Sequence, residues 1–91
     1  MMDADQERIE KRLADIWRQL YGEDLEILPT DSFFGLGGTS ILAVRLVERV
    51  RQEFDVDFRL KAIIDDPTLR GQLAHICNLT RAREGSETGE I

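Results

Sequence analysis

The sequence predicts an all-α domain with three main helices, one short helix and a long loop between the first two helices. Three segments repeat apolar residues at the spacing of an amphipathic helix. The one stretch that alternates, residues 55–59, is too short for a sheet and has no partner strand elsewhere. Two prolines, Pro29 and Pro67, mark breaks between segments. With 91 residues, the chain has room for one small domain.

The first helix is predicted from about residue 6 to Tyr21. Its apolar residues recur at helical spacing, and charged residues occupy the other faces. The apolar positions are Ile9, Leu13, Ile16, Trp17 and Leu20. Asp3 or Asp5 is a candidate N-cap, and Gly22 suits a left-handed C-terminal stop.

The segment from residue 23 to Thr39 shows no period and contains Pro29 and three glycines. A connection of this length in a small domain is usually functional or disordered. A disordered linker would lack large apolar side chains, and this segment has six of them. They are Leu25, Ile27, Leu28, Phe33, Phe34 and Leu36. We therefore expect a structured loop held by its own hydrophobic residues.

The second helix is predicted from Ser40 to about Phe54. Its apolar stripe consists of Leu42, Leu46, Val47, Val50 and Phe54. An extended loop follows at residues 55–59, with Val56 and Phe58 between charged residues. Residues 60–64 are predicted to form one or two helical turns.

The last helix is predicted to start at Asp66-Pro67-Thr68, with Asp66 as the cap and Pro67 in the first turn. Its buried face would be formed by Leu69, Leu73, Ile76 and Cys77. Gly71 inside the helix costs about 1 kcal/mol relative to alanine. From Thr80 onward the apolar period is lost, so a frayed tail is expected.

The composition excludes several classes of function. Eighteen acidic against twelve basic residues give a net charge of −6, which argues against a general nucleic-acid binder. No stretch is long and apolar enough to span a bilayer, and the N-terminus lacks an apolar signal region. A single cysteine excludes an internal disulfide and suits a reducing cytoplasm. One histidine and one cysteine are too few for a His/Cys zinc site, so no metal is expected.

The most informative segment reads Asp-Ser-Phe-Phe-Gly-Leu-Gly-Gly-Thr-Ser-Ile-Leu from Asp31 onward. Gly37 and Gly38 permit unusual backbone angles and remove side-chain bulk beside Ser40. Ser40 lies at the predicted start of a helix, where unpaired N–H groups and the helix dipole favour a phosphate ester. The alternative is that Ser40 serves as a helix N-cap. A cap by itself needs no pair of glycines.

These residues resemble the signature of the carrier-protein family, in particular the peptidyl carrier (thiolation) domains of nonribosomal peptide synthesis. That signature is roughly Asp-x-Phe-Phe-x-Leu-Gly-Gly-x-Ser-Leu. The chain supplies Asp31, Phe33, Phe34, Leu36, Gly37, Gly38 and Ser40. The first helix with its Ile16-Trp17 pair and the Pro67-Thr68-Leu69 start of the last helix are also similar to the family. Thr39 stands where the family commonly has Asp, His or Asn.

The resemblance extends over residues 7–79, with residues 1–6 as an N-terminal extension and residues 80–91 as a flexible C-terminal tail. It implies a four-helix carrier-protein bundle. It also implies 4′-phosphopantetheine attached to Ser40, which is flanked by Gly37, Gly38 and Thr39. Ile64 stands near a position where the family often has Phe, and is expected to be a core substitution.

By resemblance, the protein is a non-catalytic, monomeric, cytoplasmic carrier. A phosphopantetheinyl transferase would attach the arm, and an adenylation or acyl-loading enzyme would charge its thiol with an aminoacyl, peptidyl or other acyl group as a thioester. Condensation, tailoring or thioesterase enzymes would then act on that group. No nucleic-acid or membrane partner is expected.

The second helix decides the expected subtype. Between residues 40 and 54 it carries three arginines against two glutamates, whereas fatty-acid carriers have a strongly acidic second helix. This favours the peptidyl type, with partner contact through residues near the serine more than through acidic steering. The candidate contacts are Phe34, Ile41, Val44, Arg45 and Ile63. For Phe34, Val44 and Ile63 the alternative is core burial. An acyl carrier of a polyketide or fatty-acid pathway, or an unmodified helical interaction domain, also stays open.

Enzymatic alternatives for this segment fit less well. A hydrolase elbow requires Gly-x-Ser-x-Gly, but Ser40 is followed by Ile41 and Leu42. The only histidine, His75, is expected at the rim of the last helix. A nucleotide-binding loop would need a lysine before the serine, which is missing. Cys77 shares a face with Leu73 and Ile76 and is expected to be a small core residue rather than a thiol carrier.

Overall fold

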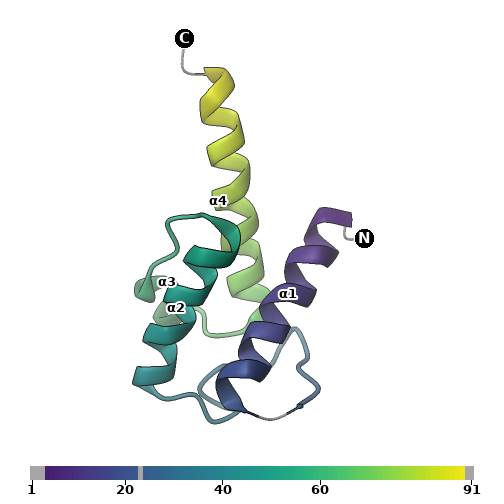
Figure 1. Ribbon diagram of the computed structural model, residues 1–91, viewed down its shortest axis with the longest axis vertical. Helices are drawn as coiled ribbons and strands as arrows, with labels where there is room; N and C mark the ends of the chain where they lie inside the picture. Colours follow the sequence, from purple (N-terminus) through teal and green to yellow (C-terminus); the bar gives the residue numbers. More distant parts are fainter. Residues whose placement is uncertain (1–3, 23, 90–91) are drawn as a thin grey trace.

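A computed structural model describes residues 4–22 and 24–89, with side chains as far as residue 82 in the last helix (Figure 1). Within these residues the elements are α1 (Ala4–Tyr21), α2 (Ser40–Phe54), α3 (Leu60–Asp65) and α4 (Leu69–Gly89). The β-type pairing in this part of the chain is one isolated antiparallel bridge, between Ser32 and Thr68. The all-α prediction is therefore confirmed.

α1 begins at Ala4, ahead of the predicted start near residue 6. Asp5 lies inside the first turn and is not the N-cap, while Asp3 lies outside the described residues. At the other end, Gly22 adopts a φ of 74°, and its N–H donates to the Arg18 carbonyl at 2.9 Å. The predicted left-handed stop is confirmed.

α2 ends as predicted at Phe54, where Asp55 takes a left-handed conformation with φ of 54°. Its N–H closes the helix by donating to the Arg51 carbonyl at 3.0 Å. The extended loop that follows buries Val56 and Phe58 in the core. The alternation at residues 55–59 therefore marks an extended segment that turns two side chains into the core. It has no partner strand among the described residues.

The start of α4 differs from the prediction. Thr68, not Asp66, caps the helix, since its Oγ1 accepts the Gly71 N–H at 3.0 Å. Pro67 precedes the helix instead of forming its first turn. The Asp66 carboxylate accepts the Thr68 hydroxyl at 2.7 Å and the Thr68 N–H at 3.2 Å, and these bonds lower the pKa of Asp66. A Cβ at Gly71 would overlap this carboxylate, so a larger residue there would force the Asp66 side chain to move.

The end of α4 also differs from the prediction. The helix runs to Gly89, so the loss of helical structure expected from Thr80 onward is wrong (Figure 1). The spacing of apolar residues indicates which face of a helix packs against a core. A helix can continue beyond its last packed turn, where that spacing is absent. Figure 1 shows these final turns projecting beyond the other helices. The flexibility of residues 80–91 stays a prediction.

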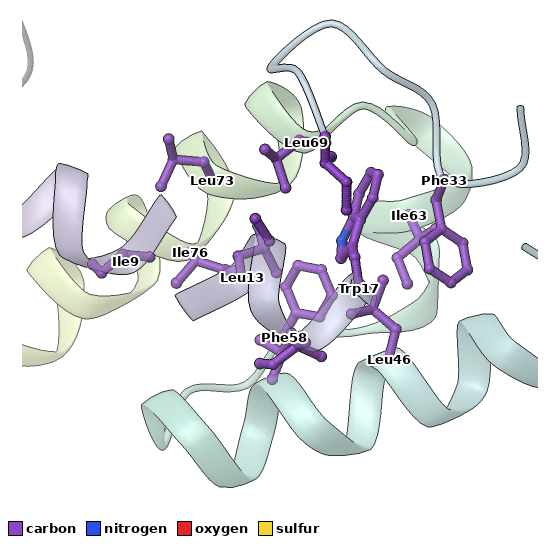
Figure 2. Close-up of a cluster of buried hydrophobic side chains, with 14 of the residues drawn as sticks. Ile9, Leu13, Trp17, Phe33, Leu46, Phe58, Ile63, Leu69, Leu73 and Ile76 are labelled. Carbon is purple, nitrogen blue, oxygen red and sulfur yellow. The ribbon is translucent and has the colours of Figure 1, made fainter. Parts of the chain in front are cut away.

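The core forms where α1 packs against both α2 and α4, with α3 in contact with α2 and α4 (Figure 2). Trp17 is fully buried in it, and its indole N–H donates to the Oε1 of the buried Gln72 at 3.1 Å. The amide of Gln72 reaches the Pro67 carbonyl at 3.4 Å. The largest fully buried apolar side chains are Trp17, Phe33, Phe58, Leu13, Leu46, Ile63, Leu69, Ile76 and Val50. No helix in the described part of the chain is long and apolar enough to cross a membrane.

Candidate functional site

Two adjacent hydroxyl residues at the start of α2 have separate roles. Thr39 is the N-cap: its backbone is extended, and its Oγ1 accepts the Leu42 N–H at 3.2 Å. Ser40 is the first helical residue and is exposed. The alternative in which Ser40 serves as the cap is therefore wrong. None of the described residues provides a hydrogen-bond partner for the Ser40 hydroxyl, which is available for modification.

The electrostatic setting of Ser40 suits a phosphate ester. The first turn of α2 contains no acidic residue, so no carboxylate there would repel an anion. The N–H groups at the start of a helix and its dipole attract negative charge. Ser40 thus fits phosphopantetheine, whose phosphate would lie at this helix end.

The two positions before Thr39 require glycine for different structural reasons. Gly37 adopts a φ of 116°, which L-residues rarely take. A Cβ on Gly38 would lie 2.5 Å from the Phe33 ring and 2.7 Å from the Phe33 carbonyl oxygen. The absent side chain of Gly38 therefore makes room for Phe33, whereas the sequence suggested that it made room beside Ser40.

Phe33 anchors the loop to α1. Its ring is fully buried, 5.2 Å from Trp17 in an edge-on contact and 5.3 Å from Tyr21 in a stacked one. The Tyr21 hydroxyl donates to the Phe33 carbonyl at 2.8 Å. Burial, and then the negative charge of Asp31, raises the pKa of Tyr21, so the hydroxyl keeps its proton and remains a donor. Sequence reasoning missed this role of Tyr21 because no local pattern links it to Phe33.

The other attachment of the loop is to the start of α4. The N–H of Arg70 donates to the Pro29 carbonyl at 2.8 Å, and that of Leu69 to the Asp31 carbonyl at 3.1 Å. The Phe33 N–H in turn donates to the Pro67 carbonyl at 2.9 Å. Helices leave their first N–H groups without internal partners, and here the loop satisfies two of them. The predicted structured loop is confirmed, and Ser40 is positioned from both α1 and α4.

The side chains predicted to contact partners are mostly on the surface. Ile41 is 70% exposed, Val44 47% and Phe34 40%, and Arg45 is also exposed. Ile63 is the exception, since it is fully buried and cannot offer a contact surface in this structure.

The exposed isoleucine of α3 is instead Ile64, at 63% exposure, which corrects the expectation of a core substitution there. One residue along a helix turns the side chain by about 100°, so the order of two adjacent isoleucines decides which is buried. Leu60, 38% exposed at the start of α3, was also missed as a surface residue.

The remaining reactive side chains lie apart from this arrangement. Cys77 is buried on α4, which confirms it as a small core residue. The His75 ring packs 5.7 Å from Phe58 and is partly buried, consistent with the predicted rim position. Within the described part of the chain, no group of three or more histidine, cysteine or acidic side chains could hold a metal ion.

Comparison with known proteins agrees with this geometry. Residues 11–76 match the family profile described as a phosphopantetheine attachment site. The chain is 37% identical over 70 residues to gramicidin S synthase 2 of Brevibacillus brevis, covering 77% of this chain and 2% of that protein. It is 31% identical over 90 residues to the L-2-aminoadipate reductase of Saccharomyces cerevisiae, covering 98% of this chain and 6% of the reductase. It therefore spans only a small part of these relatives.

Solved structures give the same result. A peptidyl carrier protein in complex with the phosphopantetheine transferase Sfp and coenzyme A superposes with a TM-score of 0.74 at 27% identity, covering 86% of this chain and 95% of that one. The complex of docking domains from the Pax synthetase gives 0.79 at 32% identity, covering 90% of this chain and 78% of that one. The chain therefore belongs to the carrier-protein family that the phosphopantetheine attachment site defines.

Proposed function

We propose that this protein carries aminoacyl, peptidyl or other acyl intermediates on a 4′-phosphopantetheine arm attached to Ser40, in nonribosomal peptide or related natural-product biosynthesis. The observation that carries the proposal is the exposed Ser40 hydroxyl. It is not used as the helix cap, because Thr39 provides the cap. The likeness to peptidyl carriers supports the assignment of the pathway.

The chain's own contribution would be to bind and orient. The N-terminus of α2 stabilises the phosphate, and the fixed loop keeps the attachment point in one place on the surface. When bound, the arm supplies a terminal thiol on which an acyl group is carried as a thioester. Tethering raises the effective concentration of that group at each partner's active site. We propose that bond-making and bond-breaking belong to those partners.

The partners in this proposal are a phosphopantetheinyl transferase, an adenylation or acyl-loading enzyme, and condensation, tailoring or thioesterase enzymes. The exposed apolar side chains Ile41 and Val44, which lie within about one turn of Ser40 on α2, support a contact surface beside Ser40. The charge of α2 supports the peptidyl subtype over a fatty-acid one, since its arginines outnumber its glutamates.

The test is the intact mass after incubation with coenzyme A, Mg²⁺ and a broad-specificity transferase. We expect a gain of one phosphopantetheine on the parent protein and none on Ser40→Ala. Thr39→Ala is the matched control, because it removes the neighbouring hydroxyl. It should still be modified, although losing the cap costs about 1 kcal/mol of stability.

Two results would count against the proposal. Modification that persists in Ser40→Ala would place the attachment elsewhere. A folded parent protein that gains no mass, both with a transferase active on a control carrier and with the transferase of its source organism, would favour the unmodified interaction domain.

A further inference from the structure

Ser40 lies at one end of a stripe of side chains that runs along α2. Because an α-helix has 3.6 residues per turn, positions 44, 47 and 51 point within about 40° of the direction of position 40. The stripe therefore continues from Ser40 through Val44 and Val47 to Arg51. With a rise of about 1.5 Å per residue, Arg51 lies about 16 Å along the helix from Ser40.

This stripe forms one wall of a surface groove of about 460 Å³. The groove is lined by Val44, Val47, Arg51, Arg59 and Leu60. Val44 and Leu60 are 47% and 38% exposed, so the middle of the groove offers apolar surface to a ligand. The residues that line it include two arginines and no acidic side chain.

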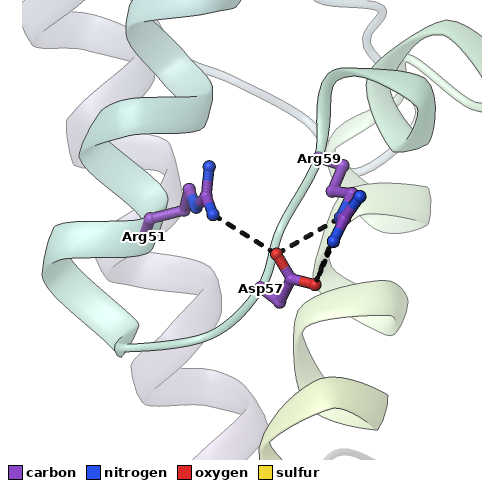
Figure 3. Close-up of polar contacts among 3 residues, drawn as sticks. All are labelled: Arg51, Asp57 and Arg59. Atoms are coloured by element: carbon purple, nitrogen blue, oxygen red, sulfur yellow. Dashed lines mark hydrogen bonds and ion pairs between the residues drawn. The ribbon is translucent and has the colours of Figure 1, made fainter.

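The two arginines share one carboxylate (Figure 3). Arg59 binds Asp57 through its Nε and Nη2, with Nη2 2.9 Å from the Asp57 Oδ2. Arg51 reaches the Asp57 Oδ1 through a single contact of 3.3 Å. Two guanidinium groups against one carboxylate leave a local charge of +1. More than half of each of the three side chains is exposed, so this charge is accessible to a ligand.

The distance from Ser40 to Arg51 along α2 is close to the length of a phosphopantetheine arm. From phosphorus to sulfur the arm has thirteen bonds, which standard bond lengths and angles extend to about 16 Å. A group tethered at Ser40 can therefore reach Arg51 and Arg59 by lying along the stripe. This step rests on the proposed function, because it takes Ser40 as the attachment point.

We propose that the groove binds the acyl group tethered at Ser40, and that Arg51 and Arg59 select cargo that carries a free carboxylate. Arginine pairs with carboxylates through parallel hydrogen bonds, and the single contact from Arg51 to Asp57 leaves most of its donors for a second acid. A neutral cargo, that is, a tethered acyl group without charge, has only apolar contacts in the groove. A cationic one is repelled by the local positive charge.

The experiment uses isotopically labelled protein loaded from two coenzyme A analogues with hydrolysis-resistant cargo. One cargo is a glutaryl group, and the other is its neutral terminal amide, which has nearly the same shape. We expect the glutaryl form to shift the backbone and side-chain NMR signals of Arg51 and Arg59. The neutral form should shift signals near Ser40 and those of the apolar side chains that line the groove, but not the side-chain signals of Arg51 and Arg59. High salt should remove the difference, because both arginines are exposed.

Two variants accompany the measurement. The double substitution Arg51→Gln and Arg59→Gln should make the response of Leu60 to the glutaryl group equal to its response to the neutral amide. Arg8→Gln is the matched control, since Arg8 is also an exposed arginine that pairs with an aspartate, Asp5 at 3.4 Å, but lies on α1. It should leave the response unchanged.

The outcomes separate this inference from the function on which it rests. Mass spectrometry first establishes loading of every sample, and a protein that does not load overturns the proposed function as well. If a loaded protein responds equally to both cargoes, or if the double variant still responds differently to them, the carboxylate selection is wrong. If the double variant instead weakens only a partner enzyme's reaction, the arginines form a protein contact. The comparison of the two cargoes needs no variant, so it stands even if a substitution unfolds the chain.

Discussion

The assignment of two hydroxyl groups at the start of α2 determines what this surface can do. The side-chain oxygen of a helix N-cap residue accepts a hydrogen bond from a backbone N–H, and Thr39 occupies that position. Ser40 therefore keeps its hydroxyl on the surface. The sequence indicated that a helix starts here, but it offered Ser40, and not Thr39, as the alternative cap. A shift of one residue in the helix start exchanges their roles, and single-sequence patterns do not resolve helix ends that finely.

Gly38 is the residue whose substitution should disturb the loop most directly. We expect Gly38→Ala to lower the free energy of unfolding by about 1–3 kcal/mol, because the new Cβ would overlap the buried Phe33 ring and its carbonyl. Urea denaturation followed by circular dichroism measures this loss. Gly35→Ala is the control, since a Cβ there meets Ser32 at 3.4 Å, an ordinary contact distance. Equal stability of the two variants would contradict the packing argument.

Cys77 provides a test of which group carries the thiol chemistry. It is 4% exposed on α4 and packs as a core residue. We expect Cys77→Ala to keep full modification by the transferase, with a loss of roughly 1 kcal/mol from the smaller side chain. Intact mass and thermal melting measure the two quantities. A folded variant that no longer gains mass would show that Cys77 takes part in loading.

At the scale of the helices, periodicity predicted the elements well where one face is buried. α2 has the predicted bounds, and α1 ends at Tyr21, just before the predicted glycine stop. The prediction errors occur where contacts between distant segments decide which residue caps a helix or is buried. Thr68 became the cap of α4 because the preceding residues pair with a loop that is distant in sequence. The burial of Ile63 instead of Ile64 depends on how a helix of six residues is rotated against the core, which its sequence does not specify.

The final turns of α4 should contribute little to the stability of the bundle. In the sequence, the apolar positions of this helix end at Leu79, which packs against the core. We expect removal of residues 83–91 to lower the helical circular dichroism signal but to change the free energy of unfolding by less than about 0.5 kcal/mol. Urea denaturation of the shortened and full chains measures this difference. A loss of about 2 kcal/mol or more would mean that these turns stabilise the bundle.

At the scale of the whole molecule, the apolar surface is spread over separate segments. The large exposed apolar side chains lie in the loop, on α2 and on α3, and are Leu28, Phe34, Ile41, Val44, Leu60 and Ile64. A stable dimer needs a larger apolar area than these six partly exposed side chains provide. We expect a monomer both before and after loading, which sedimentation equilibrium measures directly. A dimer mass that persists on dilution would contradict this prediction.

The carbonyl groups of Pro29 and Asp31 that receive the first N–H groups of α4 have a consequence for local unfolding. Opening the first turn of α4 breaks these bonds and frees this part of the loop from α4, and releasing the loop exposes the same amides. The two segments should therefore open as one cooperative unit, although nearly half the chain separates them in sequence. Amide hydrogen exchange at Phe33, Leu69 and Arg70 would then report a common free energy of opening. The surface that presents Ser40 therefore depends on the start of the last helix as well as on the contacts of Phe33 with α1.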